Sequence, residues 1–342
     1  MSLPISLDME PMEAHTATAI PSGDGWQYEP KWDGFRALCF RDGARVDVRS
    51  KAGEELARYF PEAVAFLGGL KPDQFVLDGE LVVPTEGRLD FDALLQRIHP
   101  AESRVKKLSR ETPARLIVFD LLVDDTGADL TGLPLRERRA ALEAFAARYL
   151  GNNPDILLSP ATADVDSAKR WFYEMAGGLD GIVAKRTDRA YEAGSRDAML
   201  KIKNLRTADC VVGGFRYAQK DRTFGSLLLG LFDSAGLLHH VGFCSSLSAA
   251  EKVAVLPRLE ALVEPPGFTG AAPGGPSRWS RNRNTEWQPL RHELVVEVQY
   301  DHFTGGRFRH GTKLLRWRPD KRPDQCRMEQ VQLDSQSPLD LL

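Results

Sequence analysis

Long apolar runs are absent from this sequence. None of its 342 residues fall in a stretch of about 18 consecutive apolar residues, which excludes a membrane-spanning helix. Residues 1–12 lack a basic cluster followed by an apolar core, so we expect no secretory signal. Cysteine is scarce, and Cys39, Cys210, Cys244 and Cys326 form no C-x-x-C pair. We therefore expect a cytoplasmic protein without a disulfide framework or a cysteine-paired zinc site.

A strong net charge is also absent. The 45 Lys+Arg and 48 Asp+Glu residues give a net charge of −3, which argues against a simple charge-driven coat for nucleic acid. One region differs from the rest, because residues 278–327 contain 12 basic and 6 acidic residues. Such an excess can attract phosphate, and a solvated face of loops and strands explains it equally well.

The hydrophobic pattern predicts two domains with a boundary near Leu205–Ala208. Helices are expected over Glu54–Phe66, Phe91–His99, Leu135–Tyr149, Ser167–Ala176 and Ser248–Leu262. Strands are expected over Phe35–Phe40, Arg45–Arg49, Phe75–Val83, Leu116–Val123, Gly181–Lys185, Met199–Ile202, Cys210–Phe215, Ser226–Phe232, Leu237–Phe243, Leu294–Tyr300 and Thr312–Trp317. The strands after the boundary, with their one helix, are the pattern of a small barrel such as the OB-fold.

The sharpest local signal is the segment E-P-K-W-D-G-F-R at residues 29–36. It places Lys31 between an acidic residue and a glycine turn. An amine is nucleophilic only when it is deprotonated, so a catalytic lysine needs a lowered pKa. Arg36 and the later lysines are candidate cations that would lower it. Taken alone, a lysine at the end of a strand is more often an ordinary surface residue.

Further charged motifs follow along the chain. The acidic residues in D-G-E (residues 78–80) interrupt an apolar strand, where they need a partner, a metal or a polar ligand. F-D at residues 119–120 closes another strand, and D-G-I-V-A-K at 180–185 frames a short one. In K-I-K (201–203) the two lysines share a strand face, and a phosphate would relieve their repulsion. Each motif alone also has an ordinary explanation as a turn, core packing or solvated charge.

Taken in order, these motifs resemble those of the covalent nucleotidyltransferases, which include ATP-dependent DNA ligases, RNA ligases and mRNA-capping enzymes. Residues 31–36 match the nucleophile motif K-x-D-G-x-R, and R-P-D-K at 318–321 is similar to the R-x-D-K motif of an appended OB domain. Within this superfamily the chain most resembles the small stand-alone bacterial DNA ligases of the ligase C type. The narrower match rests on residues 29–34, 49–50 and 316–321.

The resemblance implies an α+β fold. It implies a two-sheet, ATP-grasp-like adenylyltransferase domain over residues 1–205 and a C-terminal OB-fold β-barrel domain over residues 206–342. It also implies three transfers. Lys31 attacks the α-phosphate of ATP and carries AMP as a phosphoramidate, and AMP then passes to the 5′-phosphate at a nick in duplex DNA. The 3′-hydroxyl finally displaces AMP and seals the strand.

The resemblance also assigns roles to residues of this sequence. Lys31 is the catalytic residue, and Asp180 with Glu80 would hold Mg²⁺ or Mn²⁺; most members of the family carry Glu at the position of Asp180. Phe119 would stack on adenine, and the two lysines of residues 201–203 would neutralise the α-phosphate. The residues expected to bind the nucleotide are Glu29, Arg36, Arg49, Glu80, Phe119, Lys185, Lys201, Lys203, Arg318, Asp320 and Lys321.

Finer roles are implied for several of these residues. Arg36 and Arg49 would contact ribose or the DNA 5′-phosphate, the backbone near Glu29 would read the adenine edge, and Glu80 has hydrogen bonding to the ribose as its alternative role. The R-x-D-K motif would swing over ATP to orient the pyrophosphate and then swing away about a hinge near residues 205–207.

The partners implied are ATP, nicked duplex DNA and repair proteins, with the protein acting as a nucleoid-associated cytoplasmic monomer in DNA repair. Two other functions stay open at this point. The same lysine chemistry serves RNA ligases and capping-type guanylyltransferases, which differ in the nucleotide attached and the strand joined. A non-catalytic OB-fold protein would bind nucleic acid without becoming adenylated.

Overall fold

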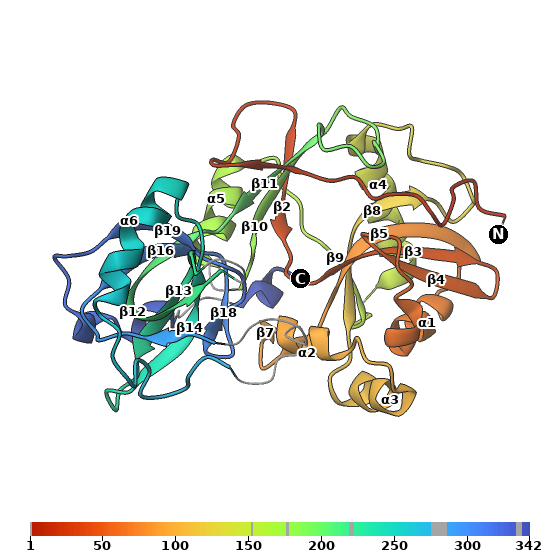
Figure 1. Ribbon diagram of the computed structural model, residues 1–342. Coiled ribbons are helices and arrows are strands. Elements are labelled where there is room, and N and C mark those ends of the chain that lie inside the picture. Colours follow the sequence, from red (N-terminus) through yellow and green to blue (C-terminus); the bar gives the residue numbers. More distant parts are fainter. Residues whose placement is uncertain (1, 152, 176–177, 219–221, 275–285, 333–336) are drawn as a thin grey trace. The chain divides into compact units, whose positions relative to one another are not determined.

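The computed structural model describes residues 2–151, 153–175, 178–218, 222–274, 286–332 and 337–342 (Figure 1). Helices and strands alternate through the first two hundred residues, and strands predominate afterwards, which confirms a mixed fold of the α+β class. Within the described ranges, every helix is too short or too polar to cross a bilayer.

The chain forms two compact units. The first comprises residues 1–204 together with 335–342, and the second comprises residues 205–334. The second domain was expected to run to residue 342. That end is wrong, because the described residues 337–342 pack against the first unit. The division after Asn204 falls between two strands that only two residues separate.

The first unit contains a four-stranded sheet of order β1-β11-β10-β2. Its strands are β1 (His15–Ala17), β2 (Trp26–Lys31), β10 (Gly181–Arg186) and β11 (Met199–Lys203). β10 runs antiparallel to both of its neighbours, and its Gly181 lies between Lys31 on one side and Lys203 on the other. One face of this sheet is apolar and packs on helix α5 (Val165–Glu174). The opposite face carries the alternating charged residues.

A five-stranded sheet of order β4-β3-β5-β8-β9 completes the first unit. Its strands are β3 (Phe35–Asp42), β4 (Arg45–Ser50), β5 (Gln74–Val82), β8 (Arg115–Val123) and β9 (Ile156–Leu158). One face packs against α1 (Pro61–Gly68), α2 (Phe91–Gln96) and α4 (Leu135–Phe145). From the other face, Leu38 and Phe40 pack with Met199 of β11. The two sheets of the first unit therefore face each other across a shared apolar cluster.

The strands of the first unit agree with expectation more closely than its helices. The helix expected over Glu54–Phe66 begins only at Pro61, after a 3₁₀ turn, η1 (Ala57–Tyr59), because proline is well tolerated at the start of a helix and poorly tolerated inside one. Helix α3 (Glu102–Glu111) was not predicted, since Val105 is its single buried residue and no apolar stripe marks it. The expected helix from Leu135 continues past α4 as a π-helical turn, η2 (Ala146–Leu150).

The second unit is built on an antiparallel sheet of order β14-β13-β12-β16-β19, with β15 pairing on β12. Its strands are β12 (Arg206–Tyr217), β13 (Phe224–Phe232), β14 (Leu238–Cys244), β15 (Gln288–Pro289), β16 (Val295–Tyr300) and β19 (Lys313–Trp317). Helix α6 (Ala249–Glu260) packs Val255 and Leu259 into the core of the unit. The five strands and one helix expected here are therefore confirmed.

Short elements complete the description: the hairpins β6 (Pro84–Thr85)–β7 (Arg88–Leu89) and β17 (Phe303–Thr304)–β18 (Arg307–Phe308), and the 3₁₀ turns η3 (Pro323–Gln325), η4 (Met328–Val331) and η5 (Pro338–Leu341). Residues 278–285 of the expected basic stretch lie outside the described residues, as does Ala176 at the expected end of one helix.

Candidate active site

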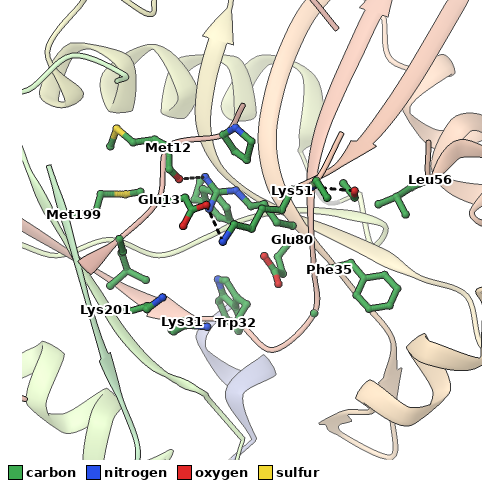
Figure 2. Close-up of a pocket in the computed structure, with 18 of the residues that line it drawn as sticks. Met12, Glu13, Lys31, Trp32, Phe35, Lys51, Leu56, Glu80, Met199 and Lys201 are labelled. Carbon is green, nitrogen blue, oxygen red and sulfur yellow. Dashed lines mark hydrogen bonds and ion pairs between the residues drawn. The ribbon is translucent and has the colours of Figure 1, made fainter. Parts of the chain in front are cut away.

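A pocket of about 910 Å³ lies in the first unit and is lined by residues of both sheets (Figure 2). Seven of the predicted site residues line it: Glu29, Lys31, Arg36, Glu80, Phe119, Lys185 and Lys201. Asp180, Lys203 and Arg49 belong to the same unit without being part of that lining. The remaining three, Arg318, Asp320 and Lys321, belong to the second unit.

The turn that follows Lys31 is held tightly against the second sheet. Lys31 is the last residue of β2, and a β-carbon placed on Gly34 would lie 2.2 Å from the carbonyl oxygen of Leu81, so only glycine permits this approach. The indole Nε1 of buried Trp32 donates a hydrogen bond to Ser159 Oγ at 2.9 Å. These contacts explain why the nucleophile motif contains a glycine, and they fix the backbone that carries Lys31.

Asp180 lies directly against Lys31. Its Oδ2 forms an ion pair with Lys31 Nζ, and its backbone amide donates to the Lys31 carbonyl at 3.0 Å. The Asp180 side chain is 8% exposed, so water screens this pair weakly. Gly181 follows with φ of +142°, and a β-carbon there would lie 1.9 Å from the carbonyl of Ile202. The Asp-Gly sequence therefore places a carboxylate at the nucleophile and lets the backbone pack on β11.

The electrostatics around Lys31 differ from our expectation. Burial by itself lowers the pKa of Lys31, but nearby carboxylates, first of all Asp180, raise it, and the resulting pKa lies above the ordinary value. The expected lowering by adjacent cations is therefore wrong for this state of the protein. Burial raises the pKa of Glu80 to about 7, against the lowering effect of Lys31 and Arg36. The pKa values of these two groups therefore favour the protonated form of Lys31 and place the titration of Glu80 near pH 7.

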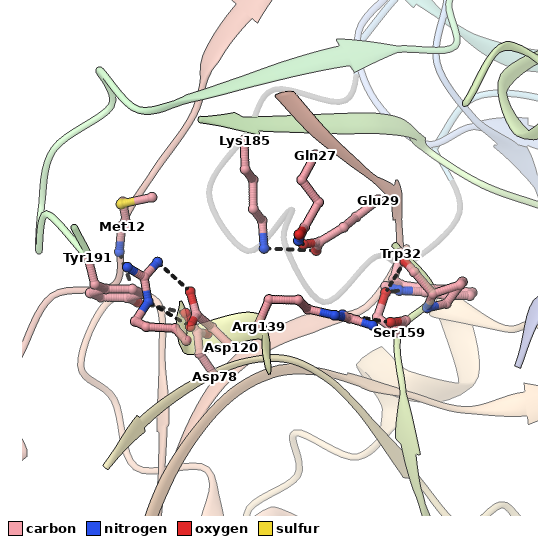
Figure 3. A network of polar contacts seen from close by, with 12 residues as sticks. Met12, Gln27, Glu29, Trp32, Asp78, Asp120, Arg139, Ser159, Lys185 and Tyr191 are labelled. Carbon is pink, nitrogen blue, oxygen red and sulfur yellow. Dashed lines mark hydrogen bonds and ion pairs between the residues drawn. The ribbon is translucent and has the colours of Figure 1, made fainter. Parts of the chain in front are cut away.

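Lys185 of β10 and Glu29 of β2 form an ion pair in the pocket wall (Figure 3). Lys185 Nζ and Glu29 Oε2 are 2.8 Å apart and both side chains are buried, and Gln27 Nε2 donates to Glu29 Oε1 at 2.7 Å. Lys185 Nζ lies 4.6 Å from the centroid of the Phe119 ring, and Arg36 Cζ lies 4.7 Å from it. The ring thus contacts two cations, an arrangement that its negative faces favour.

The Arg36 guanidinium is bound by the buried carboxylate of Asp78. Its Nε and Nη2 atoms each lie 2.5 Å from an oxygen of Asp78, which is inaccessible to solvent. Tyr191 also donates its hydroxyl hydrogen to Asp78, at 2.6 Å. This confirms the expectation that an acid inside the apolar strand needs a partner. Asp120, from the F-D motif, is likewise buried and forms a two-pronged ion pair with Arg138.

Lysines gather on the charged face of the first sheet. Alternation along β11 places Lys201 and Lys203 on one face, as predicted, and their strand pairing sets Lys203 in line with Lys31 across Gly181. Burial and the positive charges of Lys51, Lys31 and Lys203 lower the pKa of Lys201. Lys51, which lines the pocket and pairs with Glu13 at 3.0 Å, was not predicted. Arg49 was predicted through the R-S motif at residues 49–50, and Lys51 directly follows that motif.

Arg49 itself points to a different partner. Its Nη2 lies 3.3 Å from Oδ1 of Asp47, which also pairs with Arg45 at 2.7 Å. Ser50 and Lys51 line the pocket, whereas Arg49 does not. A role for Arg49 toward ribose or a DNA phosphate stays a prediction.

In the second unit, the R-P-D-K motif is organised around an acid that we did not predict. Asp209 of β12 accepts from Arg318 Nη1 at 2.9 Å and from Lys321 Nζ at 2.6 Å. Arg318 also binds Asp320 at 2.8 Å and lowers the pKa of that carboxyl to about 2. Asp209 could have been found by the argument applied to Asp78, because it too interrupts an apolar strand.

The carboxylates near Lys31 suit a hard divalent cation. Asp180 pairs with Lys31, and the charge of Glu80 also acts on the Lys31 ammonium group. Within the described part of the chain, no group of three or more His, Cys, Asp and Glu side chains could hold a metal ion. Mg²⁺ is commonly bound by one or two carboxylates, with waters and substrate phosphates completing its shell. The residues present fit such a cation.

Comparisons with known proteins identify the family of this chain. Residues 11–203 match the ATP dependent DNA ligase domain, and residues 220–321 match the ATP dependent DNA ligase C terminal region. DNA ligase C2 of Mycolicibacterium smegmatis is 44% identical, over 98% of this chain and 97% of that protein. LigD of Mycobacterium tuberculosis, a multifunctional non-homologous end joining DNA repair protein, is 31% identical over 93% of this chain and 39% of its own length.

The fold is shared with solved structures as well. A structure of Lig E DNA ligases is 16% identical, covers 90% of this chain and 99% of its own, and has a TM-score of 0.55. Identity at this level speaks for the fold alone, whereas the family match extends over both units of the chain. The chain belongs to the ATP-dependent DNA ligase family and, within it, to the ligase C type.

Proposed function

We propose that this protein is an ATP-dependent DNA ligase that seals nicks in duplex DNA, with Lys31 as the residue that becomes adenylated. The observation that carries the proposal is the position of Lys31 at the wall of the 910 Å³ pocket, paired with Asp180 and in line with Lys203. Lys31 would be the nucleophile, Asp180 would supply a carboxylate for a metal, and Lys203 would supply a cation for phosphate. Lys31 and Lys203 are aligned across Gly181, which directly follows Asp180.

Proton control at Lys31 follows from its neighbours. A bound Mg²⁺ or Mn²⁺ would supply positive charge for the phosphate oxygens. An Asp180 carboxylate that held the metal would no longer favour the proton on Lys31, and burial would then favour the neutral amine, with the proton passing to water. The neutral amine attacks the α-phosphorus, an N–P bond forms, the P–O bond to pyrophosphate breaks and pyrophosphate leaves, and the nitrogen loses its second proton to water.

The other wall residues would bind the nucleotide. Lys201 and Lys203 face the α-phosphate, whose negative charge relieves the repulsion that lowers the pKa of Lys201. Phe119 offers an aromatic surface for adenine, but it is 8% exposed and carries Lys185 and Arg36 against its ring. Stacking therefore requires one of these cations to move from the ring. Glu29 would lie at the adenine edge and Glu80 at the metal or the ribose.

For the second unit we propose the OB-fold barrel. An isolated bridge joins Cys244 at the end of β14 to Thr312 just before β19, and Leu314 donates its amide to Ser246 Oγ at 2.8 Å. These contacts bring the two edges of the sheet together, as closure of a barrel requires. Arg318, Asp320 and Lys321 would orient the pyrophosphate, and the basic residues after Arg291 would bind the duplex backbone. DNA binding should then fall steeply with salt.

The proposed biological setting is DNA repair. The likeness to LigD supports DNA repair, with nicked duplex DNA as the substrate and repair proteins as partners. Acting on chromosomal DNA would place the protein in the cytoplasm near the nucleoid, and we propose that it acts as a monomer.

Labelled ATP and a divalent metal, followed by denaturing gel electrophoresis, test the proposal. The wild-type protein should form a labelled adduct and transfer its AMP to a nicked duplex. Lys31→Ala should form no adduct, yet should retain some sealing of a nick that already carries AMP, because the final nucleophile is the DNA 3′-hydroxyl. An adduct on the folded variant would identify another nucleophile. Labelling by GTP, or sealing of nicked RNA alone, would point to the capping or RNA-joining chemistry.

A further inference from the structure

Residues 337–342, which we call the returning segment, lie on the first unit although the second unit precedes them in sequence. The segment forms the 3₁₀ turn η5, and Ser337 caps it by accepting a hydrogen bond from the Leu339 amide at 3.2 Å. Figure 2 shows its pale blue ribbon beside Trp32 and Lys31. Neither Pro338 nor Leu341 lines the pocket, so any effect on chemistry must be indirect.

Two contacts fasten the start of the returning segment. The Ser337 hydroxyl donates to the carbonyl oxygen of Gly87, in the turn between β6 and β7. Pro338 is buried against Gly178, where a β-carbon would lie only 2.5 Å from the proline ring. Gly178 precedes Asp180 by two residues, so this contact supports the backbone that leads to the proposed metal ligand.

The end of the segment packs against a cluster that contains the residue after Lys31. Leu341 packs against an apolar cluster formed by Trp32, Val82, Ile117, Phe119, Met175 and Leu179. Within that cluster Trp32 directly follows Lys31, and Leu179 directly precedes Asp180. Lys31 and Asp180 are therefore each next in sequence to a member of the apolar cluster against which Leu341 packs.

We propose that the returning segment positions Lys31 and Asp180 for lysine adenylation, with Pro338 and Leu341 as positioning residues. The inference rests on the proposed function. A side chain removed from the cluster would allow Trp32 and Leu179 to shift, and displacements near 1 Å can cost about 100-fold in rate when reacting groups must align. Binding of ATP would change less, because the charged residues proposed to bind it lie outside this cluster, which contains only Phe119 of the proposed nucleotide-binding residues.

The experiment measures adduct formation as a function of ATP concentration for the full chain. We expect Leu341→Ala to lower the maximal rate about tenfold while the KM for ATP stays within about twofold. Leu341→Met should restore most of the rate because it refills the same space. Leu342→Ala is the matched control, since Leu342 is 38% exposed. Sealing of a pre-adenylated nick should fall less than adduct formation, because Lys31 is not its nucleophile.

A second pair of variants tests the contact between Gly178 and Pro338 at the start of the returning segment. Gly178→Ala would place a methyl group on Pro338 and displace the segment without altering Leu341, whereas Gly132→Ala meets no atom within 4 Å. Gly178→Ala should reproduce the loss of maximal rate, and Gly132→Ala should not. Thermal unfolding of each variant separates loss of rate from loss of folded protein.

The outcomes are distinguishable. If wild-type protein forms no adduct, the ligase proposal itself is wrong. If wild-type protein forms the adduct and folded Leu341→Ala matches its maximal rate, or if only the KM rises, the positioning role is overturned and the ligase proposal stands.

Discussion

Lys31 and Asp180 are joined twice, once by the ion pair between their side chains and once by the backbone hydrogen bond from the Asp180 amide to the Lys31 carbonyl. The backbone hydrogen bond fixes the distance between the two backbone segments, and the side-chain ion pair keeps the amine protonated. A nucleophile held in this way is unreactive until its carboxylate partner is engaged elsewhere. In the proposed mechanism the same residue keeps the amine protonated at rest and would release it as a metal ligand.

Replacing Asp180 tests this control of the proton. Asp180→Asn removes the main cause that raises the pKa of Lys31, so the neutral amine becomes more abundant at pH 8. We expect acylation of Lys31 in the absence of ATP and metal to increase, because only the neutral amine reacts. Competitive labelling read by mass spectrometry measures it. Asp166→Asn, at the exposed pair with Lys169, is the control and should leave Lys31 labelling unchanged.

Glu80 should link stability to pH. Its folded-state pKa of about 7 lies above the ordinary value of 4.5, so the carboxyl contributes stability below pH 4.5 that is lost as the pH rises through 7. Glu80→Gln has no charge to bury and should be more stable than wild type at pH 8, by about 1–2 kcal/mol after allowance for partial exposure, and similar at pH 4.5. Thermal unfolding across this range gives the difference.

The matched control for Glu80 is Glu102→Gln on the exposed face of α3, where no pH-dependent gain is expected. A wild-type protein whose stability relative to Glu80→Gln did not fall between pH 4.5 and 8 would show that Glu80 is ionised throughout. Because Glu80 also faces the proposed metal, the stabilised variant should adenylate poorly.

Lys203 should matter for chemistry and little for folding. It lies in line with Lys31 across Gly181, where it would meet the α-phosphate. Lys203→Ala should slow adduct formation by roughly 10- to 100-fold, the range for loss of one preorganised group at developing charge. Its unfolding temperature should stay near that of wild type. Lys107→Ala, at a lysine 70% exposed on α3, should behave as wild type in both measurements, and normal adduct formation by Lys203→Ala would remove Lys203 from the site.

Asp320 should serve ATP activation and not sealing. Its carboxylate is 63% exposed, stays ionised above about pH 2, and braces Arg318 from the side opposite Asp209. Asp320→Ala should slow adduct formation while leaving the sealing of pre-adenylated nicks largely intact. Asp324→Ala removes a similar exposed pair, with Arg322, and should affect neither step. Equal loss of both steps in Asp320→Ala would contradict a role limited to activation.

The strands and the position of Lys31 at the pocket could be predicted because their signals are local. The apolar runs of β5 and β8 are unmistakable, and the positions of Lys31 and Gly34 follow from one short motif. The lysines of β11 were placed on one face by simple alternation, which the strand pairing confirms. What was predicted correctly depended on a pattern within a few residues.

The rest depends on contacts between distant residues. Arg36 was assigned to substrate, yet its guanidinium is bound by Asp78, 42 residues away, and no local pattern shows that pairing. The raised pKa of Lys31 follows from Asp180 lying against it, which requires the pairing of β2 with β10. Helix α3 lacks an apolar stripe, and the returning segment contains too few residues to show a period.

The chain passes between its two units twice, near residues 204–205 and 334–335. Docking of the returning segment therefore closes a loop that contains the whole second unit. Closing a flexible loop costs entropy that increases with its length. When residues 205–334 are folded, most of that length is already fixed, and the remaining cost is small; when they are unfolded, it is larger. Folding of the second unit thus favours the docked position of Leu341, and the two units share part of their unfolding free energy through chain connectivity alone.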